Sequence, residues 1–103
     1  MFLIIFYVPV PEAELVKRAL FEAGAGRIGD YQECSWEVLG EGQFRPMEGS
    51  APFLGKEGEV ERVAELRVEM VVEEPFIDEV VKALLEAHPY EEPAYHVLKT
   101  DNY

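Results

Sequence analysis

The alternation of hydrophobic and polar positions along the chain predicts six regular elements. Residues 2–8 are apolar at every position and rich in β-branched and aromatic side chains, which indicates a strand. Residues 11–24 repeat apolar side chains at helical spacing behind Pro11, and Gly24 is expected to end that helix. The remaining expected elements are strands at residues 31–39, 60–72 and 94–99 and a helix at residues 75–87.

The order of these elements predicts the fold class. It is βαβ followed by βαβ, the pattern of a ferredoxin-like sandwich. We expect an α+β domain in which a four-stranded antiparallel sheet carries two helices on one face. Aligning Pro11 with Pro75 also places Leu20 on Leu84. This similarity between the two helices fits an internal duplication. It fits equally well two amphipathic helices that converged on one pattern.

One long connection interrupts the regular elements. At about residues 40–59, glycine and proline are frequent and no hydrophobic period holds. Loops of this length are usually functional or disordered. We therefore expect a single domain over residues 1–103 with a long loop at about residues 40–59.

The first strand is apolar on both of its faces. Ile4 and Phe6 lie on one face, and Leu3 and Ile5 lie on the other. Two helices cover only one face of a sheet, so the second face needs another cover. Packing of sheet against sheet between identical subunits is a general solution. We expect a homo-oligomer.

Composition and charge narrow the possible partners. The chain has 103 residues, with 21 acidic and 9 basic side chains and a net charge of −12. Such a charge argues against nucleic acid and against an anionic membrane surface as partners. No apolar run approaches the ~20 residues of a membrane helix, and we expect a cytoplasmic protein. The single cysteine, Cys34, excludes a disulfide scaffold and is expected to be a packing residue.

Acidic residues recur on one side of the third predicted strand. These residues are Glu61, Glu65 and Glu69. If that strand joins a subunit interface, its carboxylates must be paired or must stay at the rim, because unpaired buried charges are costly. Arg67 is the nearest counter-charge in the sequence.

Two segments carry a resemblance to a known family. They are Gly42-Gln43-Phe44-Arg45-Pro46, continuing to Gly55, and His88-Pro89-Tyr90-Glu91-Glu92-Pro93-Ala94-Tyr95. With the βαβ-βαβ frame, they resemble the domain inserted in bacterial members of the Ngg-interacting-factor-3-like family, also called GTP cyclohydrolase I type 2-like. That inserted domain is similar to the CutA and PII signalling proteins. The resemblance implies a ferredoxin-like unit that assembles as a trimer.

The same resemblance limits what transfers to this chain. The larger family carries its dinuclear metal site on flanking domains, so no family metal ligand is assigned here. The resemblance implies a stand-alone version of the insert, without the hydrolase label of the parent family. Function must then be argued from the residues of this chain.

The long loop and the segment at residues 88–95 supply the candidate ligand-binding residues. These candidates are Gln43, Arg45, Ser50, Tyr90 and Tyr95. Arg45 and Ser50, with Lys56 and glycine N–H groups, would suit a small anion such as a carboxylate or phosphate. The alternative is a loop shaped by glycine and proline to pack on a neighbouring subunit. Tyr90 and Tyr95, with the other aromatic residues Trp36, Phe44 and Phe53, fit a pocket wall or core packing.

One cluster has the chemistry of a metal site. His88, Glu91 and His96 combine imidazole and carboxylate ligands, which suit a divalent metal such as zinc, manganese or iron. Their spacing is loose, and a histidine that ends a helix is favoured by the helix dipole alone. A divalent metal is therefore the one cofactor considered, beside a structural interpretation of the same residues.

These observations favour a protein that is not an enzyme. No nucleophile with a base and an orienting acid is recognisable in the sequence. The leading hypothesis is a non-catalytic module for small-ligand binding, oligomerisation or regulation, trimeric and with a pocket between subunits. The alternative is a metal-assisted hydrolase or divalent-metal-binding protein that uses His88, Glu91 and His96. A third hypothesis is a regulatory partner of a separate protein that holds the metal domains.

Overall fold

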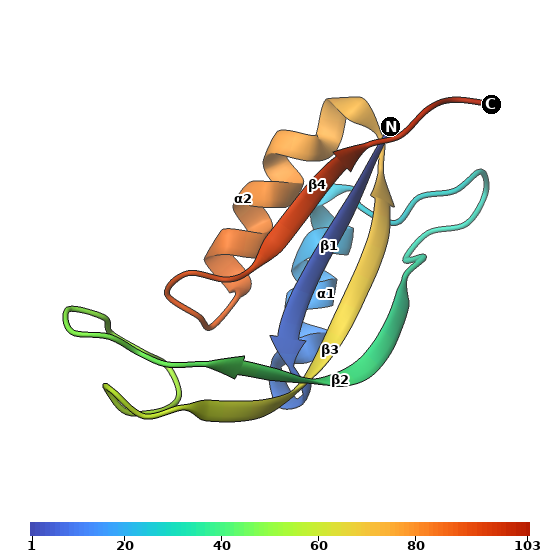
Figure 1. Ribbon diagram of the computed structural model, residues 1–103. Helices are drawn as coiled ribbons and strands as arrows, with labels where there is room; N and C mark the ends of the chain where they lie inside the picture. The colour runs from blue at the N-terminus through green and yellow to red at the C-terminus, as the bar shows by residue number, and fades with distance from the viewer.

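The computed structural model describes residues 1–103 and has two layers, a sheet and a pair of helices. The elements are β1 (Phe2–Pro9), α1 (Ala13–Ala23), β2 (Trp36–Phe44), β3 (Glu61–Val72), α2 (Ile77–Ala87) and β4 (Tyr95–Lys99). Short 3-10 turns at Val10–Glu12 and Glu74–Phe76 precede the two helices. All strand pairs are antiparallel, in the order β2-β3-β1-β4 (Figure 1). The predicted ferredoxin-like fold is confirmed.

Strand β1 lies inside the sheet, with β3 on one side and β4 on the other. Phe2 pairs with Val72 of β3 and with Lys99 of β4. Both edges of β1 are therefore hydrogen-bonded, which satisfies its backbone groups without water. A central strand with a neighbour on each edge is where an unbroken hydrophobic run is expected, and the sequence of β1 is such a run.

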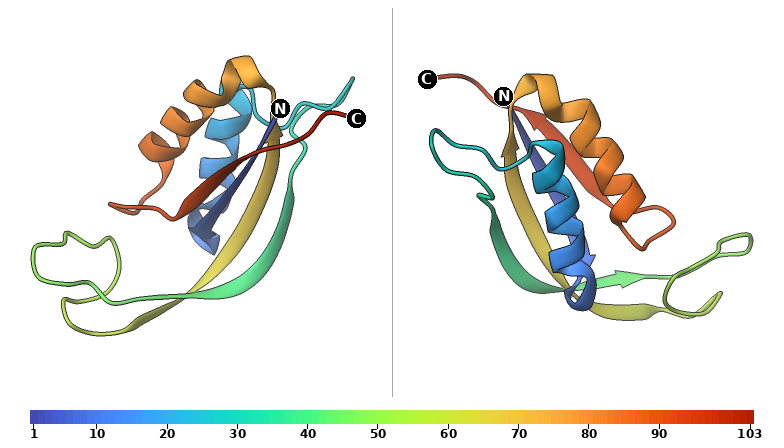
Figure 2. Two further views of the ribbon diagram at one scale, coloured as in Figure 1. Left: turned by 45° about the horizontal axis from the view of Figure 1, so that its top comes forward. Right: turned by 180° about the vertical axis from the view of Figure 1, so that it is seen from behind.

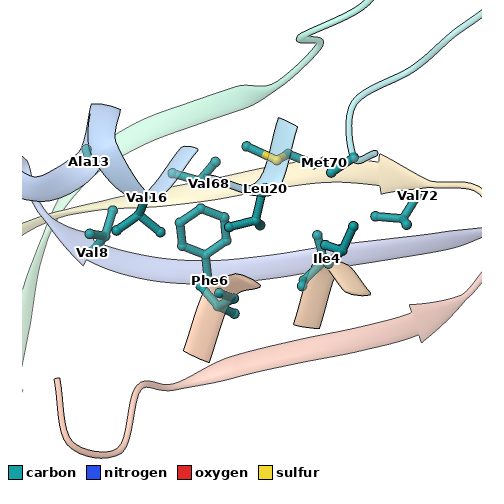
Figure 3. Packing of buried hydrophobic residues seen from close by; sticks show 12 residues of the cluster. Ile4, Phe6, Val8, Ala13, Val16, Leu20, Val68, Met70 and Val72 are labelled. Carbon is teal, nitrogen blue, oxygen red and sulfur yellow. The ribbon is translucent and has the colours of Figure 1, made fainter. Parts of the chain in front are cut away.

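The hydrophobic core lies between the sheet and the helices (Figure 3). Alternate residues of β1, namely Ile4, Phe6 and Val8, are fully buried there. The other strand and the helices contribute Val68, Met70 and Val72 from β3, Ala13, Val16 and Leu20 from α1, and Val80 and Leu84 from α2. Burying each large side chain contributes about 1.5–3 kcal/mol. The opposite face of the sheet, here called the open face, has no helix over it (Figure 1).

The two helices begin and end at residues that suit those positions. Pro11 and Pro75 lie in the 3-10 turns, where a missing N–H costs little. Gly24 follows α1 with φ +116°, and its N–H bonds back to the carbonyls of Leu20 and Phe21. At eleven residues each, α1 and α2 fall short of the length and apolar character needed to cross a membrane.

The second strand differs from its prediction at both ends. Residues 31–35 form local turns instead of the start of β2: Tyr31 and Ile28 exchange two backbone hydrogen bonds of 2.9 Å, and Cys34 N–H bonds to Gly26 O at 2.8 Å. At its other end β2 continues through Gly40 and on to Phe44, so the loop starts at residue 45 instead of about 40. Glycine did not break the strand because the β3 partner pairs with it throughout.

The far ends of β2 and β3 extend past the helices as an arm, which comprises residues 41–62 (Figure 2). The arm gives the molecule its longest dimension of 46 Å. At the other end of the sheet, the two ends of the chain meet. Both the N–H and the hydroxyl of Thr100 donate to the carbonyl of Met1, at 3.0 and 3.2 Å.

Replacing Gly24 by alanine tests how α1 ends. An alanine at this φ is strained, and its Cβ would lie 2.8 Å from Cγ of Phe76. Gly49 has a φ of +90° but open space around it, so Gly49→Ala is the nearer control for the backbone contribution. We expect Gly49→Ala to lower the free energy of unfolding by about 1 kcal/mol and Gly24→Ala by about 2–3 kcal/mol in urea denaturation. Equal losses would contradict the role given to the Phe76 contact.

Candidate functional site

A groove of about 620 Å³ opens beside the arm. It lies between the arm, the turn at residues 88–94 and the adjoining part of the open face. Figure 1 shows that turn, just before β4, on the same side of the molecule as the loop of the arm. The walls of the groove include Tyr7, Phe44, Phe53, Glu65, Tyr90 and Glu91. Three segments that are distant in sequence therefore enclose one space.

Tyr90 connects the parts of the groove wall. Its hydroxyl donates to Oε2 of Glu65 at 2.8 Å, and its backbone N–H donates to Nδ1 of His88 at 3.1 Å. Its ring packs against Phe44 and Phe53 of the arm, with centroids 5.8 and 6.4 Å away. Burial and the adjacent Glu65 carboxylate raise the pKa of Tyr90 far above its ordinary value. The Tyr90 hydroxyl is therefore a fixed hydrogen-bond donor.

His88 fixes the turn that carries Tyr90. It follows α2, is only 6% exposed, and has hydrogen-bond partners at both ring nitrogens. Because Nδ1 accepts the Tyr90 N–H, the proton is assigned to Nε2, which donates to the carbonyl of Tyr7 at 2.6 Å. Burial lowers the pKa of His88, against the opposing effects of the Tyr7 carbonyl, Glu65 and Glu12. The neutral imidazole ties the turn to β1.

The Glu65 carboxylate reaches Tyr90 because residue 42 is a glycine. A Cβ at Gly42 would overlap Oε1 of Glu65, whereas a Cβ at Gly40 would meet no atom within 4 Å. Both glycines lie in β2 and both line the groove. Gly42 thus makes space for an acid, and Gly40 leaves the floor of the groove open.

Three of the predicted ligand-binding residues line this groove: Gln43, Ser50 and Tyr90. Arg45 is exposed and does not line it, and Tyr95 packs against the hydrophobic core. The Ser50 hydroxyl donates to the carbonyl of Met47 at 2.7 Å and so closes a turn of the loop. Lys56 also lies outside the lining. The groups expected to hold an anion are therefore not brought together.

The predicted metal ligands His88, Glu91 and His96 do not meet. Glu91 accepts the backbone N–H of Ala51 at 2.8 Å and joins the turn to the loop of the arm. His96 lies on the open face of β4, edge-on to Tyr7 with ring centroids 6.5 Å apart. No three histidine, cysteine, aspartate or glutamate side chains are grouped to hold a metal ion. The geometry gives no support to the predicted metal site.

Four residues that shape the groove are not among the predicted ligand-binding residues. They are Tyr7, Gly42, Glu65 and Arg67. Strand alternation offered a signal, because Tyr7 lies between the buried Phe6 and Val8 and so faces away from the core. Glu65 and Arg67 likewise alternate with core-facing residues of β3. The register that brings β2 beside these acids could not be derived from the sequence.

The predicted aromatic residues divide between two cavities. Phe44 and Phe53 line the groove with Tyr90, whereas Trp36 lies beside a second cavity of about 260 Å³. The expected counter-charge on β3 is present, since Arg67 Nε lies 3.3 Å from Glu69 Oε2. The Cys34 thiol is half-buried, and Sγ lies 3.8 Å from the carbonyl of Gln32.

The open face carries large apolar side chains beyond the groove. Leu3 and Ile5 of β1 lie on it, and Leu98 of β4 pairs with Leu3. Trp36 is 59% exposed and Leu98 is 49% exposed. The second cavity forms where Leu3, Trp36 and Val71 meet the loop before β2. Glu69 of β3 lies between Trp36 and Ile5 on this face and is paired with Arg67. Exposed large apolar side chains around such an ion pair are typical of an association site.

Comparison with known sequences places the chain among longer relatives. No family model matches the chain. The GTP cyclohydrolase 1 type 2 homolog of Mycobacterium bovis is 53% identical over 93 residues, which is 90% of this chain and 24% of that protein. The chain thus spans about a quarter of the length of the curated relatives it matches.

Solved structures agree with the sequence comparison. A Bacillus cereus protein related to NIF3 is 42% identical with a TM-score of 0.82, over 98% of this chain and 26% of that chain. The PII-like protein CutA from Nostoc sp. PCC 7120 has a TM-score of 0.70 at 22% identity, over 99% of this chain and 83% of that chain, which shows a shared fold. Over nearly its whole length, the chain is therefore similar to a segment with the CutA fold that makes up about a quarter of the NIF3-related GTP cyclohydrolase 1 type 2 homologs.

Proposed function

We propose that the chain is a non-catalytic binding and assembly module that forms a homotrimer through its open face and binds a small ligand in the groove. The groove is the observation that carries this proposal. Its volume of about 620 Å³ is in the range of small-molecule sites. Tyr90 and His88 already have their hydrogen bonds in place, so ligand binding need not order the wall.

The side chains of the groove support binding better than catalysis. A general acid or base works best with a pKa near the ambient pH and an atom free to exchange its proton. The Tyr90 pKa is raised by burial and by Glu65. The ring nitrogens of His88 are both hydrogen-bonded within the protein. The alternative of a metal-assisted hydrolase would need His88 and Glu91 beside His96, an arrangement that the fold does not make.

The open face supports self-association, and it is continuous with the groove. Tyr7, Val38 and Arg67 belong to strands of the open face and also line the groove. A second copy packed on this face would cover Trp36 and Leu98 and would close the open side of the groove. The trimeric stoichiometry follows from the resemblance to CutA and PII proteins.

Replacing Leu98 by glutamate tests the assembly. Leu98 on the open face and Leu85 on α2 are 49% and 48% exposed, so Leu85→Glu is a matched control on the helix layer. We expect the wild-type protein and Leu85→Glu to be trimers at micromolar concentration by size-exclusion chromatography with light scattering. Leu98→Glu should be monomeric, because assembly would bury an unpaired carboxylate. A monomeric wild-type protein would rule out the assembly.

Replacing Gly42 by alanine tests how the groove is held in shape. The new Cβ displaces the Glu65 carboxylate from the Tyr90 hydroxyl, while Gly40→Ala on the same strand contacts nothing. We expect Gly42→Ala to lower the free energy of unfolding by about 1–2 kcal/mol. It should also bring the pKa of Tyr90 towards its ordinary value of 10.0 in an ultraviolet titration. Identical titrations of the Gly42→Ala and Gly40→Ala proteins would show that the Glu65 bond does not set the state of Tyr90.

The two histidines make a matched pair for pH dependence. Burial lowers the His88 pKa from its ordinary value of 6.5, so the unfolded chain binds this proton more readily than the folded chain. The stability that neutral His88 contributes is therefore complete above pH 6.5 and is lost as the pH falls through the folded-state pKa. We expect urea denaturation to show this acid loss in wild-type protein and in His96→Gln, and a smaller loss in His88→Gln. An unchanged slope in His88→Gln would contradict this assignment.

A further inference from the structure

The charged groups that line the groove are mostly negative. The lining carboxylates are Glu41, Glu65, Glu91 and Glu92. Arg67 is the one lining cation, and its Nε lies 3.3 Å from Oε2 of Glu69, which is outside the lining. Glu41 is similarly paired, since its Oε1 lies 3.3 Å from Nη1 of Arg62, so Glu65, Glu91 and Glu92 still outnumber the one lining cation. With a net charge of −12 on the whole chain, the groove attracts cations and repels anions.

Two of these carboxylates are held in place and still have free acceptor sites. Glu65 accepts the Tyr90 hydroxyl at 2.8 Å, and Glu91 accepts the Ala51 N–H at 2.8 Å. A carboxylate has about four acceptor positions, so one bond to the protein leaves most of them available. A bound ammonium or guanidinium would thus meet acceptors that are already oriented, in hydrogen bonds strengthened by charge.

Aromatic rings form much of the remaining wall. Phe44 and Phe53 are inclined to the Tyr90 ring by 59° and 52°. The three rings are not stacked in parallel, and so they present their faces in different directions. The face of an aromatic ring attracts an organic cation and also packs against an aliphatic stem.

The same arrangement does not suit a bare metal ion. Metal ions such as Ca²⁺ need several oxygen ligands at about 2.3–2.6 Å around one point. The acids of the groove are not grouped in this way, since no three potential ligands converge. Carboxylates spread along a groove of about 620 Å³ fit an extended ligand instead.

We propose that the groove binds an organic cation, an ammonium or guanidinium group carried on an apolar stem. This inference rests on the proposed function and assigns a ligand class to the same groove. The carrier is either a free amine or guanidino compound or a basic side chain of a protein segment. Both sources offer the same chemistry to Glu65, Glu91 and the aromatic wall.

Titration with agmatine, followed by amide NMR shifts and calorimetry, tests the proposal. Glu65→Gln and Glu91→Gln remove a charge but keep an acceptor for Tyr90 and Ala51, so both variants should fold. We expect each to weaken agmatine binding by about tenfold, the effect of one charge-assisted hydrogen bond. Glu22→Gln, on the exposed surface of α1, is the control and should leave the affinity unchanged. An equal loss in Glu22→Gln would overturn the proposal, because it would show diffuse attraction.

Phe53→Leu separates the aromatic contribution from the charge. It keeps an apolar side chain at a half-exposed position and should weaken agmatine binding by about threefold. No change in agmatine affinity would overturn the role of this ring in cation binding.

Two further probes identify the source of the ligand and the sign of its charge. A capped Ala-Arg-Ala peptide that binds more tightly than agmatine would indicate that the cation belongs to a protein segment. Tighter binding of agmatine would indicate a free small molecule. Either result supports the proposal. Binding of inorganic phosphate in the groove, with no response to agmatine or the peptide, would overturn the cation class and leave the groove as a binding site. No response to any probe would overturn both the ligand class and the proposed binding function.

Discussion

The hydrophobic character of both faces of β1 is the constraint from which the rest of the molecule follows. One face carries Ile4 and Phe6, and two helices are needed to cover it. The strand also needs hydrogen-bonding neighbours on both edges, which places it between β3 and β4. The other face carries Leu3 and Ile5 and has no helix over it, although neighbouring side chains already bury Ile5. The fold is thus complete on the helix side and open on the side where we place the assembly.

The groove depends on the same strand through a series of short contacts. The carbonyl of Tyr7 in β1 holds His88, and His88 holds the turn that carries Tyr90. Tyr90 in turn bonds to Glu65, whose carboxylate occupies the space that Gly42 leaves. The turn, the arm and the sheet are therefore positioned by one set of bonds that starts at the core. A change at His88 or Gly42 therefore alters the groove without removing Glu65 or Tyr90, the members of this set that we place against the ligand.

The sequence was sufficient for the topology because its signals were local. Apolar periodicity, Pro11 and Gly24 marked the first helix to within about two residues. The course of β2 was missed because its signals were contradictory. Gly40 and Gly42 suggest a loop in isolation, and they are tolerated in the strand only because β3 pairs with them. The turns at residues 31–35 are likewise set by backbone bonds to Ile28 and Gly26, which no periodicity reveals.

The site was less predictable than the fold, for a related reason. Tyr90 and Ser50 could be selected as candidates from composition and position. The sequence also grouped His88 with His96, although one lies buried against β1 and the other is exposed on β4. Which of two nearby residues faces the core and which faces solvent depends on strand register and on the turn between them. An anion site was expected for the same reason: Arg45 and Lys56 are near Ser50 in sequence, but the fold places acidic residues in the groove instead.

The contact between the two ends of the chain has a further consequence. Thr100 is hydrogen-bonded to Met1, so the unit leaves the sheet beside the point where it enters (Figure 1). A unit with adjacent ends can be spliced into one surface loop of another protein without separating that loop's two halves. The relatives, about four times longer than the chain, have the length to accommodate such an insertion.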